Sequence, residues 1–150
     1  YSMFSGCVDL TTLDLSNFDM SNITTVGSMF DSCTSLKNIT LFRINSNSNK
    51  LTSISRMLRN CTSLEKVDLS MIDVSKVTDM SYMFDNCFNL RSLDLTSFSF
   101  QNDIDITDMF YNVGKEATNK PISIDMTPAG KAYIESKGNS GIDSSYAKII

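Results

Sequence analysis

Four cysteines and a set of aspartates are the side chains in this sequence that could carry out chemistry. Thiolates act as nucleophiles, as metal ligands and as disulfide partners. The 150 residues include no histidine, the side chain that most often activates a nucleophile near neutral pH. No Cys-x-x-Cys pair and no glycine-rich phosphate loop occurs. We therefore expect no enzymatic activity, no cofactor and no bound metal.

The four cysteines occupy one place in a repeated phrase, Met-Phe-x-x-Cys-x-x-Leu-x-x-Leu-x-Leu. The spacing is 26 residues from Cys7 to Cys33 and from Cys61 to Cys87, and 28 residues from Cys33 to Cys61. A fifth, decayed copy has Val113 in the cysteine place. A period of this length is typical of solenoids, in which each repeat buries apolar side chains against its neighbours. The repeats start near residues 3, 29, 57, 83 and 109.

Each repeat has two predicted elements. Alternating apolar residues predict short strands within residues 10–15, 38–42, 66–70, 92–96 and 122–126, which would form one parallel sheet of about five strands. On the other side, apolar residues at i, i+1, i+4 and i+7, as in Met29, Phe30, Cys33 and Leu36, predict one or two helical turns. Apolar positions between these elements, Phe18 among them, are expected to point inward. The polar residues 45–50 predict a bulge on a loop.

The chain end differs from the repeats. Thr127 as a cap, Pro128 at the first position and Gly138 after the last predict a helix, and residues 146–150 predict a closing strand. The predicted organisation is therefore five leucine-rich repeats in residues 1–127 and a C-terminal cap in residues 128–150. The fold class that follows is a leucine-rich-repeat solenoid of the α/β type, with strands on one side and short helical turns on the other.

Composition excludes two classes of partner. The formal net charge is −4 and the pI is near 4.7, and no cluster of Lys and Arg could neutralise successive phosphates, so we expect no nucleic-acid binding. No apolar run approaches the roughly 20 residues that span a bilayer, so we expect no membrane insertion within this chain. The sequence starts at Tyr1 inside a repeat, which suggests a fragment of a longer array whose signal and anchor lie elsewhere.

The outward side of the predicted sheet is the candidate surface for binding a protein or, as an alternative, a glycan. Its middle positions, at one-strand spacing, are Asp14, Thr40, Asp68, Asp94 and Asp125. Stacked like charges repel each other, and a basic partner, a cation or neighbouring hydroxyl groups would offset that repulsion. Phe42 is the one large apolar side chain predicted on this side, where it could anchor a partner. A solvated polar face without a partner is the simpler reading.

Two further interpretations concern the cysteines and a calcium loop. The cysteines alternate with inward apolar residues, which favours buried, free thiols, while disulfides between adjacent repeats are the alternative. Asp103, Asp105 and Asp108 begin like a calcium loop, but the turn glycine and the final glutamate of such a loop are missing.

The phrase Cys-x-x-Leu-x-x-Leu-Asp-Leu-Ser-x-Phe-Asp, together with residues 77–84, resembles the 26-residue branch of the BspA-like leucine-rich repeat surface proteins. The resemblance covers residues 3 to about 113. It implies a non-catalytic module on the cell surface or secreted, which adheres to host matrix, to a host cell-surface macromolecule or to another microbial surface protein. It carries over no ligand site, because the shared positions are structural. The alternative function is a spacer or stalk that holds another domain away from the cell.

Overall fold

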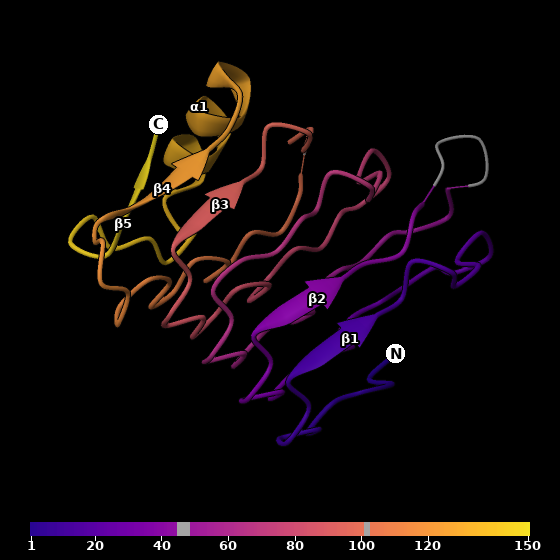
Figure 1. Ribbon diagram of the computed structural model, residues 1–150. Helices are drawn as coiled ribbons and strands as arrows, with labels where there is room; N and C mark the ends of the chain where they lie inside the picture. The colour runs from indigo at the N-terminus through magenta and orange to yellow at the C-terminus, as the bar shows by residue number, and fades with distance from the viewer. Residues whose placement is uncertain (45–48, 101–102) are drawn as a thin grey trace.

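The computed structural model describes residues 1–44, 49–100 and 103–150, so most of the loop predicted at 45–50 lies outside the described residues. Successive repeats lie side by side, and their strands run in the same direction (Figure 1). The elements in chain order are β1 (Thr12–Asp14), β2 (Asn38–Thr40), β3 (Ser92–Asp94), β4 (Ile122–Asp125), α1 (Pro128–Lys137) and β5 (Ala147–Ile149).

The strands form two separate parallel sheets, so the predicted leucine-rich-repeat solenoid with one sheet of about five strands is wrong. One sheet pairs β1 with β2, and the other has the order β3, β4, β5. The predicted strand at 66–70 is absent: within the described residues, no backbone hydrogen bond joins it to β2 or β3. The Ser70 amide donates to the Asp68 side chain, as the equivalent amides after β1 and β3 donate to Asp14 and Asp94. Leu69 is still buried. The alternation of apolar and polar residues predicts which side chains are buried, and it does not predict which backbone groups pair.

The segments predicted as helical turns, such as residues 29–36 between β1 and β2, are tight turns, so that prediction is also wrong. Ser28 and Ser32 have positive φ values of 55° and 62°, which interrupt a right-handed helix. The amides of Met29 and Asp31 donate within the repeat, to the carbonyls of Val26 and Ser28. The amides of Phe30 and Ser32, which alternate with these two along the chain, donate to the next repeat. Phe30 N lies 3.0 Å from Met57 O, and Ser32 N lies 2.8 Å from Arg59 O. Hydrogen bonding therefore alternates between the repeat itself and its neighbour.

The core consists of like apolar side chains contributed by successive repeats. Phe84 and Phe110 stack with ring centroids 6.2 Å apart, and Phe4 stacks on Phe30 at 5.6 Å. The first repeat is less enclosed: Phe18, expected to point inward, is 45% exposed, whereas Phe98 at the same place in the fourth repeat is buried. Phe18 has a neighbouring repeat on one side only among the described residues, which explains the difference.

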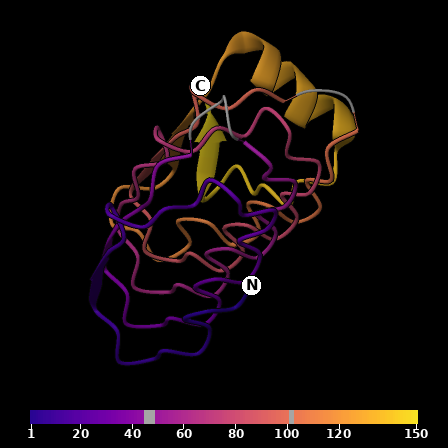
Figure 2. The same ribbon diagram turned by 90° about the vertical axis from the view of Figure 1, so that its right-hand side faces the viewer.

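The C-terminal helix and strand occur where the sequence places them. The Thr127 hydroxyl accepts a hydrogen bond from Gly130 N at 3.1 Å, Pro128 begins α1, and Gly138 ends it with φ 67°. These end signals and the closing strand β5 are therefore confirmed. α1 lies at the end of the molecule opposite β1 (Figure 2). Within the described part of the chain, no helix is long and apolar enough to cross a membrane.

Tyr133 ties α1 to the end of the fourth repeat. Its hydroxyl accepts from Ile104 N at 2.9 Å and donates to Ile104 O at 3.0 Å. We expect Tyr133→Phe to lower the free energy of unfolding by about 1–3 kcal/mol, because both backbone groups lose their partner. Urea denaturation measures this loss. Tyr111→Phe is the control, since Tyr111 is 51% exposed and should change stability by less than about 0.5 kcal/mol. Equal effects of the two variants would contradict the role of this hydroxyl.

Candidate functional site

Aspartates occupy the outward middle position of the strand-side segments, and we call Asp14, Asp68, Asp94 and Asp125 the acidic row. Asp94 lies opposite Asp125 in the pairing of β3 with β4, whereas Asp14 lies opposite Thr40 in the pairing of β1 with β2. Asp14, Asp68 and Asp94 are exposed, although Asp68 is not on a strand. Asp68 and Asp94 line one small hollow, so the structure places Asp94 beside both Asp68 and Asp125, while Thr40 separates Asp14 from Asp68.

Each exposed carboxylate of the acidic row is held by a turn to the residue two places later. Oδ1 accepts the backbone N–H of Ser16, Ser70 or Thr96 at 2.8–2.9 Å. The pKa of Asp14 is lowered first by the Ser16 N–H and then by its hydroxyl. The pKa values of Asp68 and Asp94 are lowered first by the hydroxyl and then by the N–H of Ser70 and Thr96. These side chains are therefore ionised at neutral pH and fixed in direction.

Asp125 differs from the other members of the acidic row. It is only partly exposed, and its Oδ1 atom is buried without a hydrogen-bond partner. An unpaired buried oxygen is costly, and its register partner Asp94 adds a second negative charge. Asp125 therefore contributes less accessible surface to the row than the sequence predicts.

Phe42 does not belong to the outward face, so its prediction as an exposed anchor is wrong. Its side chain is fully buried, and the neighbouring Leu41 and Ile44 are more than nine-tenths buried. β2 ends at Thr40, so the strand alternation does not extend to residue 42. Burying a phenylalanine side chain stabilises a protein by roughly 1.5–3 kcal/mol, which favours the inward turn of the chain at this point.

A hollow of about 370 Å³ opens on the strand side in the gap between the two sheets, where β2 and residues 68–71 face each other. Met71, which is 47% exposed, lies in its lining, and we call it the Met71 hollow. Arg43 Nη2 lies 3.3 Å from Met71 Sδ. The repeated phrase does not predict this feature. A signal was present in the sequence, because Arg43 and Met71 occupy a place that the smaller Asn17 and Ser97 hold in other repeats. The lining residues are Ser16, Ile39, Thr40, Leu41, Arg43, Asp68 and Met71.

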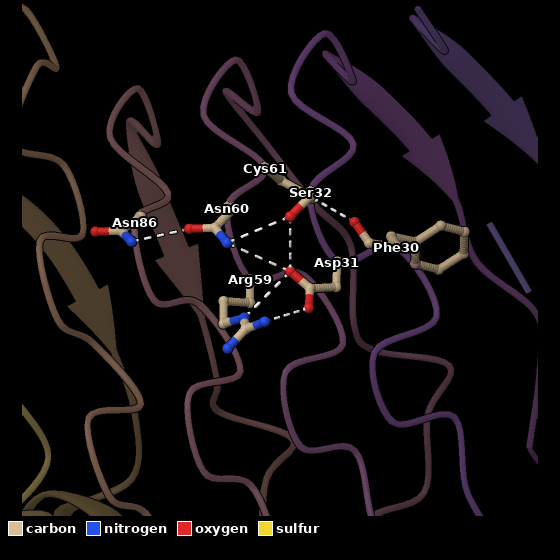
Figure 3. A network of polar contacts seen from close by, with 7 residues as sticks. All are labelled: Phe30, Asp31, Ser32, Arg59, Asn60, Cys61 and Asn86. Carbon is tan, nitrogen blue, oxygen red and sulfur yellow. Dashed lines mark hydrogen bonds and ion pairs between the residues drawn. The ribbon is translucent and has the colours of Figure 1, made fainter. Parts of the chain in front are cut away.

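A second polar feature crosses the turns on the opposite side of the repeats (Figure 3). Asn112 Nδ2 donates to Asn86 Oδ1 at 2.8 Å, and Asn86 Nδ2 donates to Asn60 Oδ1 at 2.9 Å. Next to this ladder, Arg59 binds both carboxylate oxygens of Asp31, at 3.1 and 2.6 Å. The Asp31 carboxylate raises the pKa of Arg59. All three asparagines have positive φ, so the ladder connects the equivalent turns of successive repeats.

The cysteines are structural in this arrangement. Cys33, Cys61 and Cys87 are buried, and their thiols donate to backbone carbonyls of the preceding repeat at 3.1–3.3 Å. Burial raises the pKa of Cys33 to about 11 and also raises the pKa values of Cys61 and Cys87. A protonated thiol is a poor nucleophile. All four cysteines are free in this structure, but Cys7 in the less enclosed first repeat is exposed, so the prediction of a buried thiol is wrong there.

The calcium interpretation finds no support in the geometry. Asp105 Oδ1 accepts the backbone N–H of Thr107 at 2.9 Å, as the equivalent Asp79 does from Ser81 N. Within residues 1–44, 49–100 and 103–150, no three His, Cys, Asp or Glu side chains are gathered in a way that could hold a metal ion. Asp103, Asp105 and Asp108 are therefore not arranged as a set of ligands.

The fold and the outward face define a repeat protein with an acidic, exposed strand side. The sequence matches the family described as "Mycoplasma protein of unknown function, DUF285" over residues 1–124, and the chain belongs to this family. The comparison with curated proteins finds no match, and the comparison with solved structures finds none. The family description states no function, and it does not extend to the narrower BspA-like assignment.

Proposed function

We propose that this chain is a non-catalytic binding module of a surface-displayed or secreted protein and that its acidic row contacts a macromolecular partner. The observation that supports this function is the fixed set of exposed carboxylates at Asp14, Asp68 and Asp94, each ionised and held by its own turn. Display at the surface rests on the resemblance of the repeated phrase to adhesive surface proteins.

The chemistry of the acidic row favours a partner with a basic surface. A single exposed ion pair contributes about 1 kcal/mol or less, so several carboxylates must act together. Fixed carboxylates lose little conformational entropy on binding, because their turns already hold them. A host matrix protein, a host cell-surface macromolecule or another microbial surface protein with a basic patch would meet these conditions. Binding of this kind weakens as salt is added.

The test is the adhesion of beads that carry the chain to epithelial cell monolayers. We expect the double variant Asp68→Asn/Asp94→Asn to lower the number of bound beads about tenfold, because both charges are lost. Asparagine still accepts the N–H of the turn, so the variant should fold. The matched control is Asp19→Asn/Asp143→Asn, which removes two exposed carboxylates held by the same kind of turn outside the acidic row. This control should adhere like the unchanged protein.

Adhesion should also follow the protonation of the acidic row. The pKa values of Asp68 and Asp94 lie below the ordinary value of 3.8, so adhesion should be constant from pH 8 to pH 5 and be lost below pH 3.8. Equal adhesion of both double variants would contradict this function. That result would favour the spacer, whose repeats hold another domain away from the cell.

A further inference from the structure

We infer that the Met71 hollow anchors an extended segment of a protein partner, in which an apolar side chain lies between an acidic and a basic side chain. This inference rests on the proposed function and names the class of partner more closely. The Met71 hollow adjoins the acidic row through Asp68, which belongs to both. A partner bound along the row therefore reaches the hollow without leaving the strand side.

The floor of the hollow is apolar. Ile39 and Leu41 are more than nine-tenths buried, so they form a rigid base, while Met71 is 47% exposed. Methionine is unbranched and flexible, and it adapts its shape to an inserted side chain. An aliphatic side chain would cover this surface and release water from it.

The rim of the hollow carries one charge of each sign. Arg43 takes part in neither of the two ion pairs found among the described residues, and its Nη2 contacts only the weak acceptor Met71 Sδ. A carboxylate would replace that contact with the bidentate pairing that arginine favours. The Asp68 carboxylate across the same hollow is ionised and held by Ser70. A purely basic or a purely acidic segment would meet one like charge here. The complementary segment carries both charges.

An extended segment meets all three requirements at once. In an extended chain, alternate side chains point to the same side at a spacing of about 6.6 Å. An acidic, an apolar and a basic residue at alternate positions therefore face the protein together. The sequences Glu-Thr-Leu-Thr-Lys and Lys-Thr-Leu-Thr-Glu present this set in the two possible chain directions.

Fluorescein-labelled peptides with these two sequences, flanked by glycines, are the probes for a titration followed by fluorescence anisotropy. We expect one of them to bind, and Leu→Ser in that peptide to weaken binding about tenfold. Arg43→Glu should weaken peptide binding about tenfold or more. Replacing Glu by Gln in the peptide should weaken binding to the unchanged protein more than it weakens binding to Arg43→Glu, because the two charges pair with each other. Met71→Ser should weaken binding about fivefold.

Matched controls separate the hollow from general effects of charge and exposure. Met3→Ser changes a methionine that is 60% exposed elsewhere, and Asp19→Asn changes an exposed carboxylate outside both the acidic row and the hollow. Both variants should bind the probe within about twofold of the unchanged protein. Circular dichroism confirms that each variant is folded.

The inference is overturned if neither probe binds at millimolar concentration or if Arg43→Glu binds the probe unchanged. Binding of a sulfated oligosaccharide that depends on Arg43, without binding of either peptide, would also overturn it, because the partner class would then be a glycan. In each case the adhesion of Asp68→Asn/Asp94→Asn beads still tests the acidic row by itself. The two proposals can therefore fail separately.

Discussion

Phe84→Ala is expected to lower the free energy of unfolding by about 3–5 kcal/mol. Phe84 is fully buried, and its ring stacks on Phe110 at a centroid distance of 6.2 Å. Alanine would leave a cavity between the third and fifth repeats that neighbouring side chains cannot fill without breaking the hydrogen bonds between repeats. Phe84 N, for example, lies 3.0 Å from Met109 O. Guanidinium denaturation followed by circular dichroism measures the loss.

The matched control for this prediction is Phe18→Ala. Phe18 is 45% exposed, so its removal should cost no more than about 1 kcal/mol. If both variants lose the same amount of stability, the repeats do not share a continuous core and the arrangement of Phe84 is wrong. If Phe84→Ala does not fold, the midpoint temperature of the conservative variant Phe84→Leu gives the same comparison.

Arg59→Met is expected to lower the free energy of unfolding by about 1.5–3 kcal/mol at pH 7. The guanidinium binds both oxygens of Asp31, whose side chain is only 9% exposed, so the variant leaves this carboxylate without its ion-pair partner. Arg59 is one-third exposed, which keeps the loss below that of a fully buried pair. Chemical denaturation of the two proteins at pH 7 gives the difference.

The same variant should show a pH dependence to which Asp85 contributes. Burial raises the pKa of Asp85, and the charge of Arg59 opposes this rise. A carboxyl group whose folded pKa is raised contributes stability at low pH that is lost as pH increases through the folded pKa. Without Arg59 the pKa of Asp85 rises further, so the stability difference between Arg59→Met and the unchanged protein should be smaller at pH 4 than at pH 7.

Arg56→Met is the control for both effects. Arg56 lies over the Tyr82 ring at 5.0 Å and forms no ion pair with any described residue. Its replacement should cost about 0.5–1 kcal/mol, with the same value at pH 4 and pH 7. A pH-independent loss in Arg59→Met would mean that Arg59 does not act on Asp85.

Local signals in the sequence predicted the C-terminal helix well. Thr127, Pro128 and Gly138 each act through contacts within a few residues, so their effect does not depend on the rest of the fold. The period of the repeat likewise placed the paired residues of β1 and β2 opposite each other. These predictions needed only the spacing of residues along the chain.

Predictions that depended on how neighbouring repeats bond were less successful. The alternation at 66–70 reports which side chains are buried, and Leu69 is indeed buried, but it carries no information on whether the amides reach the next strand. The place of Phe42 depended on where β2 ends. The Arg43 and Met71 contact joins two repeats through side chains whose types differ from those in the other repeats, so the repeated phrase does not predict it.

The ladder of asparagines was open to prediction and was missed. Asn60, Asn86 and Asn112 follow one another at intervals of 26 residues, and identical side chains at equal intervals lie next to each other when repeats align. The amide group donates on one side and accepts on the other, so it can continue a hydrogen-bonded ladder through any number of members.

The alternating amides of the turns also give each repeat a direction. Amides of one repeat donate to carbonyls of the next, from Phe4 to Met29, Phe30 to Met57 and Leu58 to Met83, and the order is never reversed in this series. At these turns a repeat therefore presents donors to the repeat that follows it and acceptors to the repeat before it. Bonds elsewhere in the repeat run the other way, as from Thr78 N to Thr52 O. In evolutionary terms, duplication or deletion of one whole unit in the same orientation preserves every bond at the new junction, whereas shorter insertions must be confined to loops.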